Sequence, residues 1–294
     1  MKSITIGFLF LSITSFATGE IIKTSTSKVE ILTRPVYLSY SWLNKNEYGA
    51  SLINRFTPLK GFYLVDVKKY SYQEWLRFLP IEPKKTKIKL YNGKKKFLQL
   101  LNAGVVRMDI GTRDLQQCAD AVIRLRAEYL YASKQYNQIH FNYTSGFSAQ
   151  YLKWRAGNKI AVNGNKVSYY YKPKSNDKNY SGFKSYLTNV FNYAGTYSLN
   201  RELKTRKPDN ILAGDVLIIG GFPGHVITVI AVSKNKKGEK AVLLAQSYMP
   251  AQSIHVIRNQ NKPLKGAWFL VEDFKKNGWS TIEWSYDTQH LKTW

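Results

Sequence analysis

The stretch Thr112-Arg-Asp-Leu-Gln-Gln-Cys-Ala-Asp120 holds Cys118, the only cysteine among 294 residues. Asp114 is a favoured residue for a helix N-cap, and Gln117 then takes the third helical position of a capping box. Apolar side chains recur at helical spacing at Leu115, Cys118, Ala119, Val122, Leu125 and Tyr129. The pattern predicts a helix with Cys118 in its first turn, on the stripe that faces the core.

Two interpretations of Cys118 remain open at this point. A core-facing cysteine is commonly a small hydrophobic residue. The start of a helix, however, offers partial positive charge and unpaired N–H groups, which lower the pKa of a thiol and favour its reactive thiolate. A single cysteine cannot form an internal disulfide bond, so in an oxidising compartment it is buried, paired with another chain, or reactive.

A second stretch, Ala213-Gly-Asp-Val-Leu-Ile-Ile-Gly-Gly-Phe-Pro-Gly-His-Val226, changes the pattern to strands. Residues 216–219 form an apolar run, residues 225–232 continue after the turn Gly220-Gly-Phe-Pro-Gly224, and residues 241–246 return after a basic loop. Consecutive strands that follow helices predict an α+β fold, with the cysteine helix packed on an antiparallel sheet or small barrel.

The basic loop 234–239 sets the register of the hairpin around it. A turn at its centre places His225 opposite Tyr248, with Gln246 two residues further along on the same face. A slip of one residue would bring Ser247 there instead. The sequence therefore predicts an imidazole beside a polar side chain that can orient its ring.

These parts suit acyl transfer by a cysteine hydrolase. His225 would take the proton of Cys118, and the thiolate would attack an amide or ester carbonyl before water frees the acyl group. Gln246 would orient the imidazole as the third member of a triad. Backbone N–H groups at the helix start, with Gln116 or Gln117, would bind the developing oxyanion.

Other histidines compete for these roles. His140, His255 and His290 are alternative bases, and His255 is also an alternative third member because it lies on a neighbouring predicted strand. A lone histidine after a turn is also a common structural residue. The four dispersed histidines and one cysteine show no metal-ligand spacing, so neither a metal nor another cofactor is expected.

The chain divides into three segments. Lys2, a mostly apolar run over residues 4–16 and Ala17-Thr-Gly19 predict a signal peptide over residues 1–19, because such a run is too short to span a bilayer. Residues 20–104 are predicted to pack on a core formed by residues 105–294. The expected location is the periplasm or the cell surface.

The composition points to an anionic partner. The chain has 44 Lys and Arg against 19 Asp and Glu, a net charge of +25. For an exported protein, an anionic cell-wall polymer or peptidoglycan is the expected partner rather than nucleic acid. Peripheral contact with an acidic membrane surface is compatible with the same charge, and so is a merely solubilising surface.

The two site stretches resemble those of a known superfamily. Gly214-Asp-Val-Leu-Ile-Ile219 and Gly224-His-Val-Ile-Thr-Val-Ile230, downstream of a cysteine that opens a helix, are similar to the papain-like NlpC-type cell-wall cysteine peptidases and amidases. This resemblance implies Cys118, His225 and Gln246 as the catalytic order. Gln-Cys-Ala-Asp stands where the superfamily usually has Asp-Cys-Ser-Gly.

A resemblance over nearly the whole mature chain is carried by four further stretches. These are Trp75-Leu-Arg-Phe-Leu-Pro80, Arg113-Asp-Leu-Gln-Gln-Cys-Ala-Asp-Ala-Val122, Phe191-Asn-Tyr-Ala-Gly-Thr196 and Leu244-Ala-Gln-Ser-Tyr-Met-Pro-Ala-Gln252. They resemble an exported bacterial family catalogued as domain of unknown function 4846. The resemblance implies export and a unified chain but no activity.

The expectation from sequence is an exported thiol hydrolase that cleaves an amide bond, with peptidoglycan stem peptides as the favoured substrate class. Two alternatives remain. One is a non-catalytic cell-wall or glycan-binding protein that uses its basic and aromatic surface. The other is an acyltransferase that uses the same Cys118–His225 pair with a different acceptor.

Overall fold

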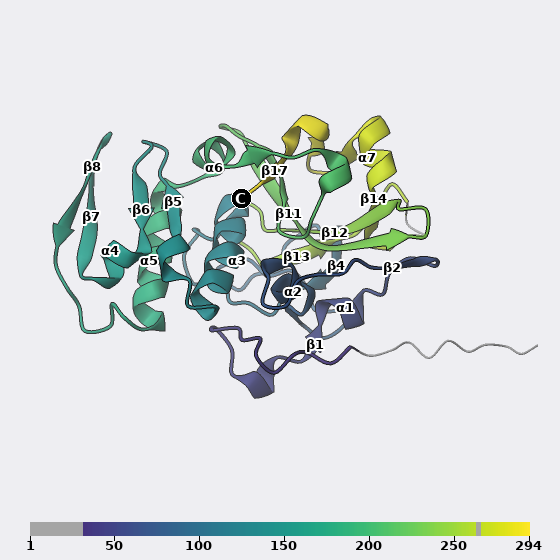
Figure 1. Ribbon diagram of the computed structural model, residues 1–294. Coiled ribbons are helices and arrows are strands. Elements are labelled where there is room, and N and C mark those ends of the chain that lie inside the picture. The colour runs from purple at the N-terminus through teal and green to yellow at the C-terminus, as the bar shows by residue number, and fades with distance from the viewer. Residues whose placement is uncertain (1–31, 263–265) are drawn as a thin grey trace, which may run out of the picture. The chain divides into compact units, whose positions relative to one another are not determined.

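The computed structural model describes residues 32–262 and 266–294, and residues 32–294 form one compact unit (Figure 1). The predicted signal peptide lies outside the described residues. Seven α-helices occur in the described part of the chain, together with an antiparallel central sheet. The helices are α1 (Leu52–Arg55), α2 (Tyr72–Arg77), α3 (Cys118–Ala132), α4 (Tyr151–Arg155), α5 (Tyr180–Tyr193), α6 (Thr196–Glu202) and α7 (Val271–Asn277).

The central sheet follows the order β4-β13-β12-β11-β10-β17-β9, with β2 attached to β11 and β14 to β12. Its strands are β2 (Phe62–Leu64), β4 (Asn102–Val105), β9 (Lys204–Thr205), β10 (Val216–Ile219), β11 (His225–Asn235), β12 (Lys240–Gln246), β13 (His255–Ile257), β14 (Trp268–Leu270) and β17 (Leu291–Thr293). Among the described residues the two end strands, β4 and β9, do not pair. The antiparallel sheet is confirmed, and the small barrel offered as its alternative is wrong.

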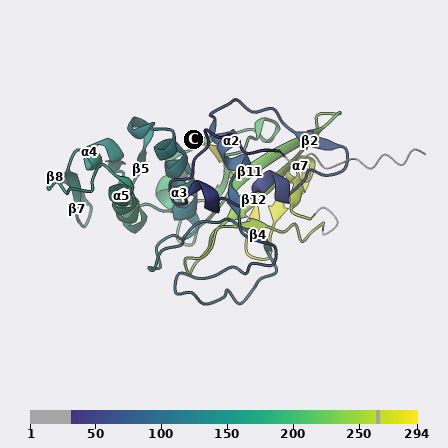
Figure 2. The same cartoon turned by 90° about the horizontal axis from the view of Figure 1, so that it is seen from below.

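The long β11–β12 hairpin is the axis of this sheet. The outer edge of β11 pairs first with β10 and then with β2, and the outer edge of β12 pairs with β13 and then with β14. Every residue of β11 from His225 to Ser233 is buried, as its nearly continuous apolar sequence predicts for a strand covered on both faces. Helices α2 and α3 pack against β11, and α7 packs against β12 and β14 (Figures 1 and 2).

The register of the hairpin agrees with the sequence prediction near the candidate site. Thr228 pairs with Ala245 and Val229 with Leu244, which are the pairs that the predicted register requires. Past Val229 a β-bulge shifts the pairing by one residue, so that Lys234 faces Lys240. The centre of the turn lies half a residue later in the chain than predicted. The bulge restores the predicted pairing beyond it, near the candidate site.

Helix α3 begins later than the sequence predicts. Gln117 is the N-cap and Cys118 the first helical residue, so the predicted Asp114 cap and the third-position role of Gln117 are wrong. The Asp114 carboxylate instead accepts the N–H of Ala251, 2.6 Å away in a distant loop. The capping partner is Asp120, whose carboxylate accepts the Gln117 N–H at 3.1 Å. Asp114 has the best local capping propensity, but its tertiary hydrogen bond to Ala251 keeps it from capping α3.

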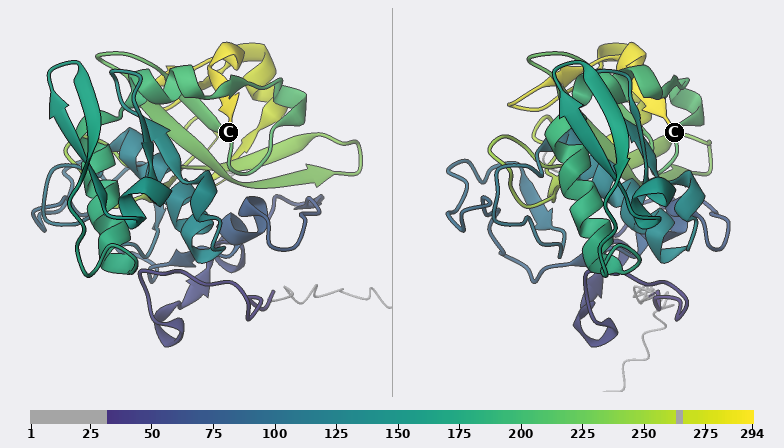
Figure 3. Two further views of the ribbon diagram at one scale, coloured as in Figure 1. Left: turned by 60° about the vertical axis from the view of Figure 1, so that its left-hand side comes forward. Right: turned by 90° about the vertical axis from the view of Figure 1, so that its left-hand side faces the viewer.

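Helices α4 and α5 lie on one side of the molecule with two small sheets, those of residues 140–150 and 158–171, and the central sheet lies on the other side (Figures 1 and 3). The small two-stranded sheets are β1 (Ala50–Ser51) with β3 (Pro80–Ile81), β5 (His140–Asn142) with β6 (Ser148–Gln150), β7 (Asn158–Asn163) with β8 (Lys166–Tyr171), and β15 (Trp279–Ser280) with β16 (Ser285–Tyr286). Strand β2 comes from the predicted N-terminal region 20–104, strand β4 crosses its end at residue 104, and both belong to the central sheet. This region therefore shares its hydrogen bonding with the core.

Candidate functional site

Cys118 lies where the start of α3 meets the start of β11. Its thiol lies near the backbone N–H groups of Val226 and Ala119, both of which act to lower its pKa. Because Val226 directly follows His225, this contact brings the predicted base and the predicted nucleophile to one place in the fold. Two stretches separated by more than a hundred residues of sequence are joined there.

The thiol of Cys118 is buried and neutral in this structure. Cys118 is only 9% exposed to solvent. Burial raises the pKa of the Cys118 thiol to about 11, and the N–H donors around the sulfur offset only part of that effect. The thiolate that the helix terminus was expected to favour is therefore not the resting form.

His225 is held by the predicted third member. Its Nε2 lies 2.9 Å from Oε1 of Gln246. The Gln246 amide is oriented by a second partner, because its Nε2 donates to the carboxylate of Glu283 at 2.7 Å. Glu283 in turn forms an ion pair with Lys96 at 2.6 Å, and both side chains are about nine-tenths buried.

This chain of contacts assigns the imidazole tautomer. A carboxylate can only accept, so the Gln246 nitrogen faces Glu283 and the Gln246 oxygen faces His225. An amide oxygen also only accepts, so His225 Nε2 carries the hydrogen. His225 Nδ1 is then the nitrogen with the free lone pair. That is the nitrogen able to act as a base.

Two aromatic side chains enclose the His225 ring. The Trp284 ring stacks on it, with centroids 5.5 Å apart and planes 20° apart. Tyr248 meets it edge-on at 4.8 Å, and the Trp284 Nε1–H donates to the Tyr248 hydroxyl at 3.0 Å. Burial lowers the pKa of His225 to about 4, although the bond to Gln246 raises it in part. The imidazole is neutral at pH 7.

The alternatives to Gln246 occupy other positions. Ser247 directs its hydroxyl to the backbone oxygens of Gln116 and Gln252, at 3.1 and 2.9 Å. His255 donates from Nδ1 to the Ser253 carbonyl at 3.0 Å, and its Nε2 lies 3.4 Å from the Gln246 amide nitrogen. His255 therefore supports Gln246 rather than His225.

His140 and His290, the remaining competitors, each face a carboxylate elsewhere in the fold. His140 lies 3.5 Å from Glu202, and His290 lies 2.9 Å from Asp287. The described part of the chain holds no cluster of three or more His, Cys, Asp or Glu side chains suited to a metal ion.

The two glutamines expected at the oxyanion site are engaged elsewhere. The buried Gln116 accepts a hydrogen bond from Arg124 and donates to the Asp109 carbonyl at 3.4 Å. Gln117 donates its side-chain amide to Asp114 at 3.0 Å. Both side-chain amides are therefore already bonded to protein groups, and neither is placed to donate to a substrate oxyanion in this structure. The first backbone N–H groups of α3 remain as candidate donors, because a helix start leaves them without helical partners.

Three residues of the site were missed from sequence, namely Lys96, Glu283 and Trp284. Lys96 ends a run of three lysines that resembles a solvated surface, and Glu283 and Trp284 belong to an aromatic C-terminal segment. The one usable signal is a carboxylate among apolar and aromatic neighbours at Ile282-Glu-Trp284. Its partner cannot be read from the sequence, because Lys96 is 187 residues away.

Comparisons with known proteins give one match. The model of the family described as domain of unknown function 4846 matches residues 52–293. No curated protein matches the chain. No solved structure matches it either. Among the described residues, no helix has the length and apolar character needed to cross a membrane.

Proposed function

The chain belongs to the family described as domain of unknown function 4846, and from the geometry of its site we propose that it is an exported thiol hydrolase. Cys118 is the nucleophile, His225 the base and Gln246 the residue that orients the base. The bond cleaved is an amide, and peptidoglycan is the substrate class. The fold is of the papain-like NlpC type, with a cysteine-bearing helix on an antiparallel sheet.

The assigned tautomer of His225 is the observation that carries this proposal. A proton acceptor must present a lone pair, and the chain from Lys96 through Glu283 and Gln246 leaves that lone pair on Nδ1. A histidine that served packing alone would not need a buried ion pair behind its amide partner. Buried charged groups are costly unless paired, so such a chain points to a ring whose protonation state matters.

The reaction starts from the neutral pair. As the Cys118 sulfur forms its bond to the carbonyl carbon, the thiol proton moves to His225 Nδ1. Collapse of the tetrahedral intermediate breaks the C–N bond, and the imidazolium gives that proton to the departing amine. Water then attacks the thioester with His225 again as base, releasing the acid and restoring the thiol.

The imidazolium formed in this cycle is stabilised by Gln246 and by the negative charge of Glu283 behind it. Glu283 thus plays the electrostatic part that a carboxylate plays in other triads, acting through an amide. Entry of substrate requires that the cover formed by Tyr248 and Trp284 moves from the ring. The proposed enzyme therefore rests in a closed form.

Export and the wall substrate are supported by the N-terminal sequence pattern and by the charge of +25. An anionic polymer is attracted to a protein of that charge, and the substrate amide lies in such a polymer. Nucleic acid is not the proposed partner.

The test is release of new amine and carboxyl termini from purified peptidoglycan by the mature protein. Wild-type protein releases them, and Cys118→Ala and His225→Ala both abolish release while near-ultraviolet circular dichroism stays unchanged. His290→Ala is the matched control, because it removes a histidine outside the site and leaves release intact. Equal release by wild type and Cys118→Ala refutes the thiol mechanism. Transfer of the acyl group to an amine acceptor without hydrolysis would identify an acyltransferase instead.

A further inference from the structure

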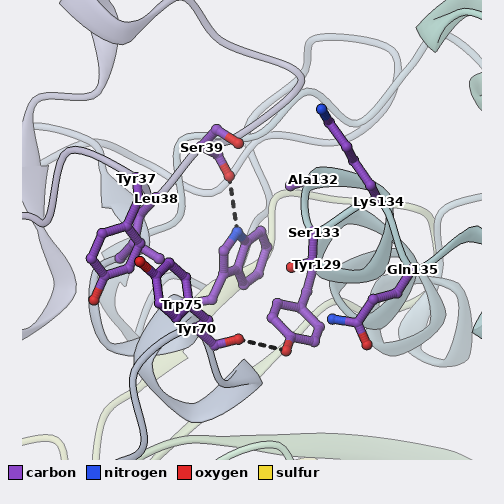
Figure 4. Close-up of a pocket in the computed structure, with 10 residues that line it drawn as sticks. All are labelled: Tyr37, Leu38, Ser39, Tyr70, Trp75, Tyr129, Ala132, Ser133, Lys134 and Gln135. Carbon is purple, nitrogen blue, oxygen red and sulfur yellow. Dashed lines mark hydrogen bonds between the residues drawn. The ribbon is translucent and has the colours of Figure 1, made fainter.

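A cavity of about 350 Å³ lies at the end of α3 that is opposite Cys118. Its aromatic lining comes from three parts of the chain: Tyr37 and Tyr70 in loops, Trp75 in α2 and Tyr129 in α3 (Figure 4). Since α3 has 15 residues, the cavity and the thiol are separated by roughly 20 Å of helix. The cavity is therefore separate from the thiol site.

One carboxylate binds the Tyr37 ring and the backbone of Tyr70, the two residues with the most exposed rings of this cavity. Glu74 accepts the Tyr37 hydroxyl at 2.7 Å and the backbone N–H of Tyr70 at 2.7 Å. The two rings are 4.3 Å apart, and Tyr70 is 64% exposed. A large aromatic face is thus presented to solvent, with the exposed Tyr70 ring packed against the bonded Tyr37 ring.

The wall behind these rings is also fully bonded. Tyr129 donates its hydroxyl to the Tyr70 carbonyl at 2.8 Å, and the Trp75 indole donates to the Ser39 carbonyl at 3.0 Å (Figure 4). Both aromatic residues are less than a tenth exposed. The cavity is therefore pre-formed, as small-molecule sites commonly are.

Backbone strain is concentrated at this cavity. Tyr70 (φ 63°) and Lys134 (φ 57°) have left-handed backbones, and Lys85 is the one other non-glycine residue of this kind in the described part of the chain. For such residues this conformation costs roughly 1–2 kcal/mol. Strain of this sort persists where the surrounding structure imposes it, and it clusters at functional sites.

Lys134 occupies a position where glycine is the usual residue. It follows the C-cap Ser133 of α3, and the N–H groups of Lys134 and Gln135 bond to the carbonyls of Tyr131 and Leu130 at 3.0 and 2.8 Å. This is a Schellman motif, whose left-handed residue is most often glycine. A lysine there costs stability, so its side chain has a use beyond ending the helix.

We propose that this cavity binds a saccharide that carries a carboxylate group. An exposed aromatic face fits the apolar face of a sugar ring, and the hydroxyl, amide and amine groups of Ser133, Gln135 and Lys134 fit its hydroxyl-rich edge. Lys134 extends from the helix end, on the other side of the cavity from Tyr37 and Tyr70, and its amine can meet a carboxylate (Figure 4).

The experiment is calorimetric titration of the mature protein with two probes of matched size. One is a hyaluronan tetrasaccharide, whose uronic acids carry carboxylates, and the other is neutral chitotetraose. We expect the acidic probe to bind more tightly. Tyr70→Gly removes the ring and weakens binding at least about tenfold, because aromatic anchors are among the residues whose truncation costs most. Lys134→Gly removes the preference for the acidic probe.

Both variants relieve a left-handed backbone, so they fold at least as well as wild type and melt at an equal or higher temperature. Loss of binding with gain of stability separates a ligand site from a packing role. Tyr171→Ala is the control, since it removes an exposed tyrosine of β8 outside the cavity. The proposal is overturned if neither saccharide binds or if Tyr70→Gly binds as tightly as wild type. It is also overturned if Tyr171→Ala loses as much affinity as Tyr70→Gly does. Cys118→Ala binds as wild type does, so failure of the hydrolase proposal is a separate result.

Discussion

Glu283 determines the state of the imidazole without touching it. Its carboxylate accepts the Gln246 amide at 2.7 Å, so the amide oxygen faces the His225 ring. The Lys96 ion pair holds that carboxylate in place. A change three contacts away from the thiol should therefore alter which ring nitrogen carries the hydrogen.

Glu283→Ala tests this coupling directly. In the wild-type protein at pH 7, ¹⁵N chemical shifts of His225 should show the neutral form with hydrogen on Nε2. Without Glu283 the amide keeps only its long 3.4 Å contact with His255 Nε2, so it can rotate more easily and the two neutral tautomers should be mixed. Glu239→Ala, which removes a carboxylate in the β11–β12 turn, is the control and leaves the shifts unchanged. An unaltered tautomer in Glu283→Ala would show that the chain does not orient the ring.

Acid should weaken the fold through its two buried histidines. Burial lowers the pKa of His225 and of His255 to about 4, below the value of 6.5 expected when unfolded. Between those two values the unfolded chain binds protons that the folded chain does not. The stability is therefore complete above pH 6.5 and is lost as the pH falls towards 4, by roughly 2 kcal/mol per ring between pH 7 and 5.

Urea unfolding at pH 7 and pH 5 measures this loss. His255→Gln should be less stable than wild type at pH 7, because it disturbs buried hydrogen bonds. Its further loss on going to pH 5 should nevertheless be smaller, since one of the two titrating rings is gone. Equal pH dependence in the two proteins would contradict the assignment.

At the scale of the element, the loop that leads into β11 has no room for a side chain. A Cβ on Gly224 would lie 2.4 Å from the Thr196 hydroxyl oxygen and 2.6 Å from the Gly221 carbonyl oxygen. The second contact is with backbone, which cannot rotate away. The position of His225 at the strand start thus depends on the glycine before it.

Gly224→Ala should destabilise the protein by about 1–3 kcal/mol, as other forced contacts in packed regions do. It should also displace the His225 ring, which the ¹⁵N shifts described above would register. Gly195→Ala is the matched control, because a Cβ there meets nothing within 4 Å and the backbone is extended. Equal stability of the two variants in urea would show that the loop before β11 can shift to accommodate a side chain at position 224.

At the scale of the whole molecule, a network of ion pairs and one buried hydrogen bond connects α3 with α5. Arg124, only 1% exposed, pairs with Asp109 before the helix and with the fully buried Glu128. Tyr180 of α5 donates to Glu128 at 2.7 Å, and Lys184 of α5 pairs with Asp109 at 2.7 Å. The face of α3 opposite the sheet therefore carries charged side chains, Arg124 and Glu128, that are fully buried.

Arg124→Met should cost about 3–5 kcal/mol, because Glu128 is left buried with a hydroxyl as its one remaining strong partner. Arg124→Met combined with Glu128→Leu should recover much of that loss, since an apolar pair of similar size replaces the ions. Urea midpoints of the three proteins give the comparison. A double variant no more stable than Arg124→Met would mean that the network contributes more than its charges.

The sequence by itself determined the elements whose information is local. Helical spacing located α3, and two nearly continuous apolar runs around a short basic loop located the β11–β12 hairpin and placed Gln246 beside His225. Periodicity and turn length act over a few residues, so they can be read without the fold. The tertiary structure alone decided three further features: the N-cap shift caused by Ala251, the burial that neutralises Cys118 and His225, and the Lys96–Glu283 pair behind the site. Each depends on contacts between residues distant in sequence, which local patterns do not encode.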